Sequence, residues 1–132
     1  MIVLFGYHPA KYIFNEMWCI SLIDKKEYID AESALSRIGK NVALYKKLLK
    51  HYLDDSHIEA LCSAIENNEP EEIGRISHTI KGVSANLSLT KLRTISTNIE
   101  TNAKSGLDCT AFIPELRQAF DATEKLILEY LD

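Results

Sequence analysis

The chain contains few of the residues that interrupt or cross-link a fold. Its 132 residues include only five glycines, three prolines and three cysteines. The cysteines Cys19, Cys62 and Cys109 are far apart, and no two of them form a C-x-x-C pair. This small, scattered and odd-numbered set argues against a disulfide framework and favours free thiols in a reducing compartment. We therefore expect a cytoplasmic protein.

Long apolar runs and basic runs are also missing. No stretch approaches the ~20 apolar residues that a membrane span requires, and no charged segment precedes an apolar one as in a signal peptide. The net charge of -4 comes without a strongly basic run, which argues against nucleic-acid binding. We expect neither a membrane nor a nucleic acid among the partners.

The residues that are present predict helices. Hydrophobic residues make up 46% of the chain and recur mostly at steps of three and four. Asp30 is expected to cap a helix over residues 31–38 that ends at Gly39, and Asn41 to cap the next helix. The apolar stripe of that second helix changes phase by about one residue along its length. It is therefore either one long helix with a broad apolar face or a helix that bends near residues 54–56.

The later helices have their own start signals. Pro70 fits the first turn of a third long helix. Ser88 or Thr90 is expected to cap the fourth helix, and Thr110 the last. The linkers between these segments are short, so successive long helices should be antiparallel neighbours.

These segments predict an all-α fold, an antiparallel up-down four-helix bundle with additional short N-terminal helices. We place the bundle at residues 28–132 and an N-terminal extension at residues 1–27. Apolar residues in that extension predict a short helix packed on the bundle, namely Ile13, Met17 and Ile20.

One histidine lies opposite the apolar stripe of the third long helix. The stripe consists of Ile73, Ile76, Ile80, Val83 and Leu87. At about 100° per residue, His78 projects roughly 170° from the centre of this stripe. Gly74 and Gly82 lie four residues to either side of it, and Ala85 lies seven after it, so the neighbouring positions are nearly bare. We expect an exposed imidazole that a macromolecular partner can reach.

The surroundings of His78 suit transfer of an anionic group. A neutral imidazole is a good nucleophile near neutral pH, because its unperturbed pKa is about 6.5. Lys81 lies within reach and can offset the nearly two negative charges of a phosphoryl group, and Arg75 can do so less directly. Each glycine inside a helix costs roughly 0.8–1 kcal/mol relative to alanine, so the two beside His78 fit a need for close approach. From these residues alone, an ordinary surface histidine remains an alternative.

The ten residues that begin at His78 resemble the signature of histidine-containing phosphotransfer (HPt) domains. They read His-Thr-Ile-Lys-Gly-Val-Ser-Ala-Asn-Leu, and the family pattern is His-x-aliphatic-Lys-Gly, then a small residue and Asn-Leu-Gly. Ser88 stands where the family usually has the last glycine, and we expect it to cap the following helix instead. Residues 34–49 also resemble the lead-in to the family's bundle. The resemblance covers residues 28 to 128.

The resemblance implies a function. His78 would be phosphorylated on Nε2 and exchange the phosphoryl group with an aspartate of a receiver domain. Lys81 would be the charge partner, Gly82 the steric gap, and Glu100 the residue that hydrogen-bonds the other ring nitrogen. The chain would be a monomeric phosphorelay intermediate without nucleotide-dependent kinase activity. A response-regulator receiver domain and a hybrid sensor histidine kinase would be its partners. No cofactor is expected in this chain, since Mg²⁺ would belong to the receiver domain.

The surface that meets the partner should surround His78. We expect it to include Glu71, Gly74, Arg75, Lys81, Gly82 and Ala85.

Other functions are compatible with a helical bundle. A non-catalytic docking or adaptor module is one alternative, and the phospho-acceptor dimerisation domain of a sensor kinase is another. The second usually has an acidic residue directly after the histidine, where this chain has Thr79. His51, Asp55, His57 and Cys62 lie near one another in the sequence, but their spacing does not place three ligands on one face. We expect no metal site.

Overall fold

The computed structural model describes residues 25–132, and every regular element in that range is helical. The helix expected around Ile13 to Ile20 lies outside the described residues. The elements are η1 (Lys25–Glu27), α2 (Ala31–Arg37), α3 (Val42–Asp54), α4 (Ile58–Glu66), α5 (Pro70–Leu87), α6 (Thr90–Lys104) and α7 (Phe112–Leu131).

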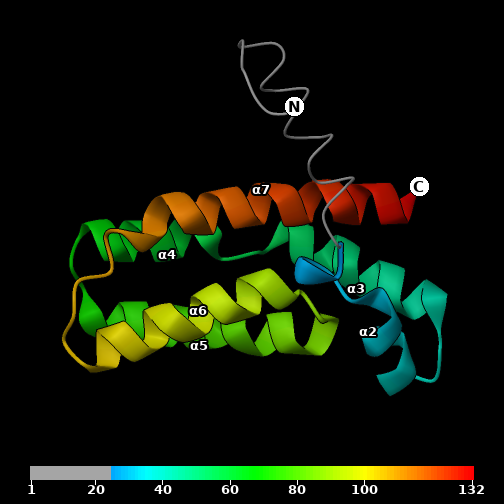
Figure 1. The fold of residues 1–132 in the computed structure, drawn as a ribbon, viewed down its shortest axis with the longest axis horizontal. Coiled ribbons are helices and arrows are strands. Elements are labelled where there is room, and N and C mark those ends of the chain that lie inside the picture. Colours follow the sequence, from blue (N-terminus) through cyan, green and yellow to red (C-terminus); the bar gives the residue numbers. More distant parts are fainter. Residues whose placement is uncertain (1–24) are drawn as a thin grey trace, which may run out of the picture.

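The long helices form an antiparallel bundle (Figure 1). Helices α3 and α4 follow one another along one side of it, and α5, α6 and α7 supply the other three sides. Helix α5 packs on both α4 and α6, and α7 packs on α6, α4 and α3. The predicted all-α, up-down four-helix architecture is therefore confirmed, with η1 and α2 as short helices ahead of the bundle.

The segment that the sequence predicts as one long or one bent helix consists of two helices. Helix α3 ends at Asp54 and α4 begins at Ile58. His57, between them, has a left-handed backbone with φ 66°, which cannot continue an α-helix. The bent alternative is correct, and the break lets each half turn its own apolar stripe toward the core.

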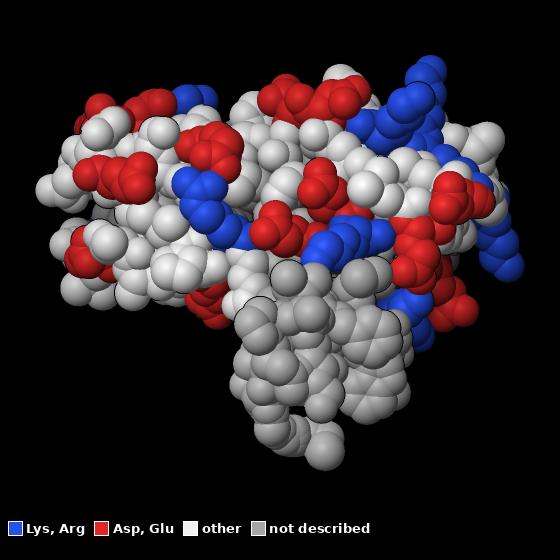
Figure 2. All heavy atoms as spheres, turned by 90° about the horizontal axis from the view of Figure 1, so that it is seen from above, with Lys and Arg blue, Asp and Glu red and all other residues white. Residues whose placement is uncertain are grey.

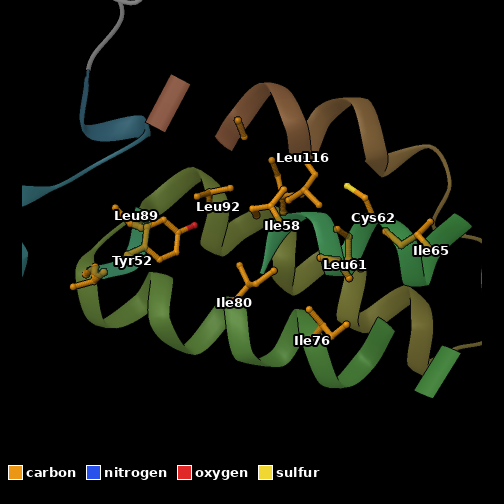
Figure 3. Packing of buried hydrophobic residues seen from close by; sticks show 14 of the residues in the cluster. Tyr52, Ile58, Leu61, Cys62, Ile65, Ile76, Ile80, Leu89, Leu92 and Leu116 are labelled. Carbon is orange, nitrogen blue, oxygen red and sulfur yellow. The ribbon is translucent and has the colours of Figure 1, made fainter. Parts of the chain in front are cut away.

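Buried apolar side chains from the facing helices pack against one another in one core (Figure 3). Tyr45 and Leu49 of α3 and Leu61 of α4 are almost fully buried. They pack with residues from the three other sides, among them Ile80, Leu92, Ile95, Ile99, Leu116 and Ile127. The Tyr45 hydroxyl donates a hydrogen bond of 2.8 Å to the carbonyl oxygen of Leu87, which joins α3 to the end of α5.

Two predicted N-caps are confirmed by their hydrogen bonds. The Asp30 carboxylate accepts from the Ser33 backbone N–H at 3.2 Å, at the start of α2. The Asn41 side chain accepts from the Leu44 N–H at 3.0 Å, at the start of α3. Gly39 follows the end of α2 with φ +67°, the left-handed conformation that favours glycine at this position.

The turn from α5 to α6 corrects the expectation for Ser88. Ser88 does not cap α6 but ends α5, with a left-handed backbone at φ 57°. Its N–H donates to the Ala85 carbonyl at 3.3 Å, and the Leu89 N–H donates to the Ser84 carbonyl at 2.8 Å. This is the Schellman pattern, which usually has glycine where Ser88 stands.

Arg37 explains how a serine is held in this position. Its Nη2 donates to the Ser88 hydroxyl at 2.7 Å and to the carbonyl oxygens of Ala85 and Asn86 at 2.9 and 3.0 Å. A guanidinium carries several donors in a fixed plane and can therefore satisfy helix-end carbonyls together. The short helix α2 thus secures the end of α5 from outside the bundle.

Two other capping predictions are also wrong. Leu89 precedes α6 without a side-chain cap, and Thr90 lies inside the helix, where its hydroxyl donates to the Lys26 carbonyl at 2.6 Å. Ala111 precedes α7, and the Thr110 hydroxyl donates to Asp108 at 2.8 Å. In both cases the hydroxyl bonds to another acceptor, on η1 for Thr90 and two residues earlier in the chain for Thr110.

The described chain begins in contact with the bundle. Besides the bond between Lys26 and Thr90, the Lys25 ammonium group lies 2.7 Å from the Glu129 carboxylate on α7. The division into residues 1–27 and 28–132 stays a prediction.

Acidic and basic side chains are interspersed on the face seen in Figure 2, and neither sign covers it continuously.

Candidate functional site

His78 lies on the outer face of α5. The stripe residues Ile73, Ile76, Ile80 and Leu87 are buried and Val83 is half-buried. The side chain of His78 is 67% exposed. The same helical period that buries the stripe turns this imidazole away from the core, so the ring is accessible while its backbone lies in a well-packed helix.

A buried carboxylate on α6 contacts one nitrogen of that ring. Oε2 of Glu100 lies 2.8 Å from Nδ1 of His78, and the Glu100 side chain is only 6% exposed. Because an ionised carboxylate can only accept, the contact requires the proton to be on Nδ1. The other nitrogen, Nε2, is then the unprotonated one in the neutral ring and lies away from Glu100.

Two lysines share the same carboxylate. Nζ of Lys81 lies 2.6 Å from Oε1 of Glu100, and Nζ of Lys104 lies 3.2 Å from Oε2. The hydrogen bond from Lys81, followed by those from Lys104 and His78, lowers the pKa of Glu100 to about 2, although burial by itself would raise it. Glu100 is therefore ionised throughout the neutral range.

The helical hairpin brings these groups together. Helices α5 and α6 run antiparallel from the turn at Ser88. Residues at equal distances from this turn face each other, so Glu100 of α6 lies opposite the His78 turn of α5. Ile99, the neighbour of Glu100, is fully buried. Its burial holds this turn of α6 on the core and sets the position of Glu100, along the helix axis, relative to the His78 ring.

An open hollow lies beside His78, between α5 and α6. Its lining residues are Pro70, Glu71, Gly74, Arg75, His78, Thr79, Glu100, Ala103 and Lys104. Among the residues that the structure describes, a methyl group added at Gly74 or Gly82 would meet no atom within 4 Å. Neither glycine is therefore needed for packing within this domain, and both leave space for a surface from outside.

A family model supplies the identification. The model described as Hpt domain matches residues 47–125, more than half of the chain and a range that includes all of the groups around Glu100. The chain belongs to the Hpt domain family. No curated protein and no solved structure is significantly similar to it. The family places the protein in two-component signalling as a phosphotransfer module, and its members carry phosphoryl groups between kinases and receiver domains.

The residues predicted for the partner surface of this Hpt domain divide into two groups. Glu71, Gly74 and Arg75 line the hollow on the side of His78 toward the start of α5. The other group, Lys81, Gly82 and Ala85, lies on the side toward the end of α5, where Gly82 is exposed and the other two are half-buried. All six are at least partly accessible around the histidine.

Arg75 has an established partner of its own. Its Nε and Nη2 each lie 2.8 Å from an oxygen of Glu72. This fork-shaped pairing explains the lowered pKa of Glu72. That Arg75 also offsets phosphoryl charge, less directly than Lys81, stays a prediction.

Sequence reasoning missed Lys104 and Ala103. Both line the hollow from α6, and Lys104 contacts the same oxygen as His78 does. A signal was available, because Lys104 follows Glu100 by four residues, which places the two side chains on one face of a helix.

Within residues 25–132, no group of three or more His, Cys, Asp or Glu side chains is placed to hold a metal ion. In the same range no helix has the length and apolar composition required to cross a membrane.

The charge of Glu100 should be measurable through stability. The Glu100→Gln variant should be less stable than wild type by about 1–3 kcal/mol at pH 7, because Lys81 loses its ionic partner. The native pKa of about 2 lies below the unfolded value of about 4.3. The ionic contribution is thus fully present above pH ~4.3 and is lost as the pH falls toward 2. Urea unfolding between pH 2 and 7 should show the two proteins converging at the acid end; a constant difference would contradict this assignment.

Proposed function

We propose that His78 of this Hpt domain accepts a phosphoryl group on Nε2 and relays it between aspartates of receiver domains. The observation that supports this proposal most directly is the exposed imidazole whose Nδ1 is held by a buried carboxylate at 2.8 Å. That contact sets the tautomer with a lone pair on Nε2, the atom that must attack.

The transfer step needs only the imidazole of His78 and the aspartyl phosphate of the receiver. The Nε2 lone pair attacks the phosphorus of a receiver's aspartyl phosphate and forms a nitrogen–phosphorus bond. The bond from phosphorus to the aspartate oxygen breaks, and its electron pair leaves with the aspartate carboxylate. Nδ1 keeps its proton throughout, and the Glu100 carboxylate stabilises the positive charge that develops on the ring. The reverse sequence passes the group to another receiver.

Gly82 and Lys81 have supporting roles in this proposal. Gly82, one turn after His78, leaves room for the receiver surface, because the reacting atoms must approach within about 3–3.5 Å. Lys81 holds Oε1 of Glu100 at 2.6 Å and contributes positive charge near the incoming group. Any Mg²⁺ would be held by the receiver domain, and no cofactor of this chain takes part.

The proposed partners are a response-regulator receiver domain and a hybrid sensor histidine kinase. We propose that the domain acts as a monomer in the cytoplasm and has no nucleotide-dependent kinase activity of its own. A dimerisation domain of a sensor kinase would instead have the mass of a dimer in light scattering.

The proposal is tested by labelling. Receiver domains from the same genome are phosphorylated with a radioactive phosphodonor, freed of that donor and mixed with the purified chain. At least one receiver should pass acid-labile, alkali-stable phosphate to the chain within seconds to minutes. Absence of labelling from every receiver and from the hybrid kinases of that genome would leave only a docking or adaptor role.

A further inference from the structure

We propose that Lys104, and not only Lys81, is a charge partner of the phosphoryl group on His78. This inference rests on the proposed phosphorylation of His78. It begins with the shared oxygen: Oε2 of Glu100 lies 2.8 Å from Nδ1 of His78 and 3.2 Å from Nζ of Lys104. No more than two hydrogen-bond lengths therefore separate the Lys104 ammonium group from the ring.

The two lysines lie on opposite sides of the histidine. Lys81 follows His78 by three residues, toward the α5–α6 turn. Lys104 follows Glu100 by four residues on the antiparallel helix, so it lies farther from that turn than Glu100 does. Lys104 also lines the hollow together with His78, whereas Lys81 is not part of that lining. A phosphoryl group on the ring would have a cation on each side.

The two lysines also differ in freedom to move. The Lys81 side chain is 32% exposed and has the shorter contact, 2.6 Å, with Oε1. The Lys104 side chain is 69% exposed and has the longer contact, 3.2 Å. Solvent screens a largely exposed ammonium group, so Lys104 can leave Glu100 more readily than Lys81 can. Lys81 is better placed to keep holding the carboxylate, and Lys104 to turn toward a new anion.

The charges around His78 favour this rearrangement. Before transfer, the Glu100 carboxylate is shared by two ammonium groups, so these three groups together carry one positive charge. A phosphoryl group adds nearly two negative charges. If Lys104 turns to the phosphoryl oxygens, Glu100 still has Lys81 and the Nδ1 proton as partners, so neither anion is left without a cation.

The test is the transfer equilibrium between the Hpt domain and the receiver that labels it best. With both proteins dilute, the equilibrium constant depends only on the free energies of the separate phosphorylated and unphosphorylated proteins. Effects of Lys104 on docking therefore cancel. Lys104→Ala should shift the equilibrium toward the phosphorylated receiver by about 3- to 10-fold, as expected for one partly screened charge pair. Added salt should reduce this difference.

Two variants complete the experiment. Lys104→Arg keeps the charge and should stay within about twofold of wild type. Lys125→Ala removes an exposed lysine from α7, a helix that contributes no side chain to the hollow, and should leave the equilibrium unchanged. An equilibrium constant for Lys104→Ala equal to that of wild type, or matched by Lys125→Ala, would overturn the role of Lys104 while the labelling of His78 stands. A wild-type chain that accepts no phosphoryl group would overturn both proposals.

Discussion

Replacing His78 by glutamine is expected to reduce phosphoryl labelling of the domain to background. Glutamine keeps a polar side chain of similar length but has no ring nitrogen with a lone pair to attack phosphorus. The fold should persist, because the His78 side chain is 67% exposed and the buried Glu100 carboxylate keeps Lys81 and Lys104 as partners. Mixing the variant with a phosphorylated receiver and counting acid-labile phosphate measures the effect.

The chain offers a matched control for this experiment. His51 is an exposed histidine on α3, outside the group of side chains around Glu100. His51→Gln removes the same chemical group and should be labelled as wild type is. Labelling that survives in His78→Gln and disappears in His51→Gln would move the phosphorylation site to α3 and refute the proposed mechanism.

The second large effect is expected at Gly82, where stability and transfer should change in opposite directions. A methyl group added there meets no atom of residues 25–132 within 4 Å, so Gly82→Ala should stabilise the domain by about 0.8–1 kcal/mol. Gly82→Phe should also fold, because its ring can extend into solvent. It should slow transfer from a receiver by at least about 100-fold, since a displacement of about 1 Å at the reacting atoms has an effect of this size.

A small phosphodonor separates steric exclusion from damage to the imidazole. Phosphoramidate needs no protein surface to dock, so it should label Gly82→Phe and wild type at similar rates. Stopped-flow or rapid-quench transfer from the receiver gives the other half of the comparison. Wild-type transfer rates in Gly82→Phe would disprove the steric role of the glycine. Equal slowing with both donors would indicate that the phenylalanine disturbs His78 itself.

Periodicity predicted those parts of the fold that depend on one segment at a time. The apolar stripe of α5 was enough to place His78 on the outer face. The caps at Asp30 and Asn41 were predictable because each depends on a hydrogen bond to a backbone N–H three residues away. The same reasoning failed for Thr90 and Thr110, whose hydroxyls donate hydrogen bonds to Lys26 and Asp108. A threonine near the start of a helix predicts a cap, but its place in the sequence does not show which acceptor its hydroxyl will contact.

The phase change in the second apolar segment was visible without coordinates, but its outcome was not. An unbroken helix and a bent one are both compatible with the apolar pattern of this segment. The choice depended on how α4 packs on α5 and α7, and the left-handed His57 is the local consequence. Ser88 likewise has the side chain of an N-cap, but its left-handed backbone ends α5 and is held there by Arg37 from a helix far away in the sequence.

By itself, the amino-acid sequence determined the helical class, the outward direction of His78 and the small residues beside it, because each of these follows from spacing along one helix. The resemblance to HPt domains predicts the hydrogen bond between Glu100 and the imidazole of His78. Only the tertiary structure decided that one buried carboxylate is shared by His78, Lys81 and Lys104. That sharing depends on how α5 and α6 are aligned along their axes. Buried side chains around the whole core set this alignment, and the local sequence of either helix does not.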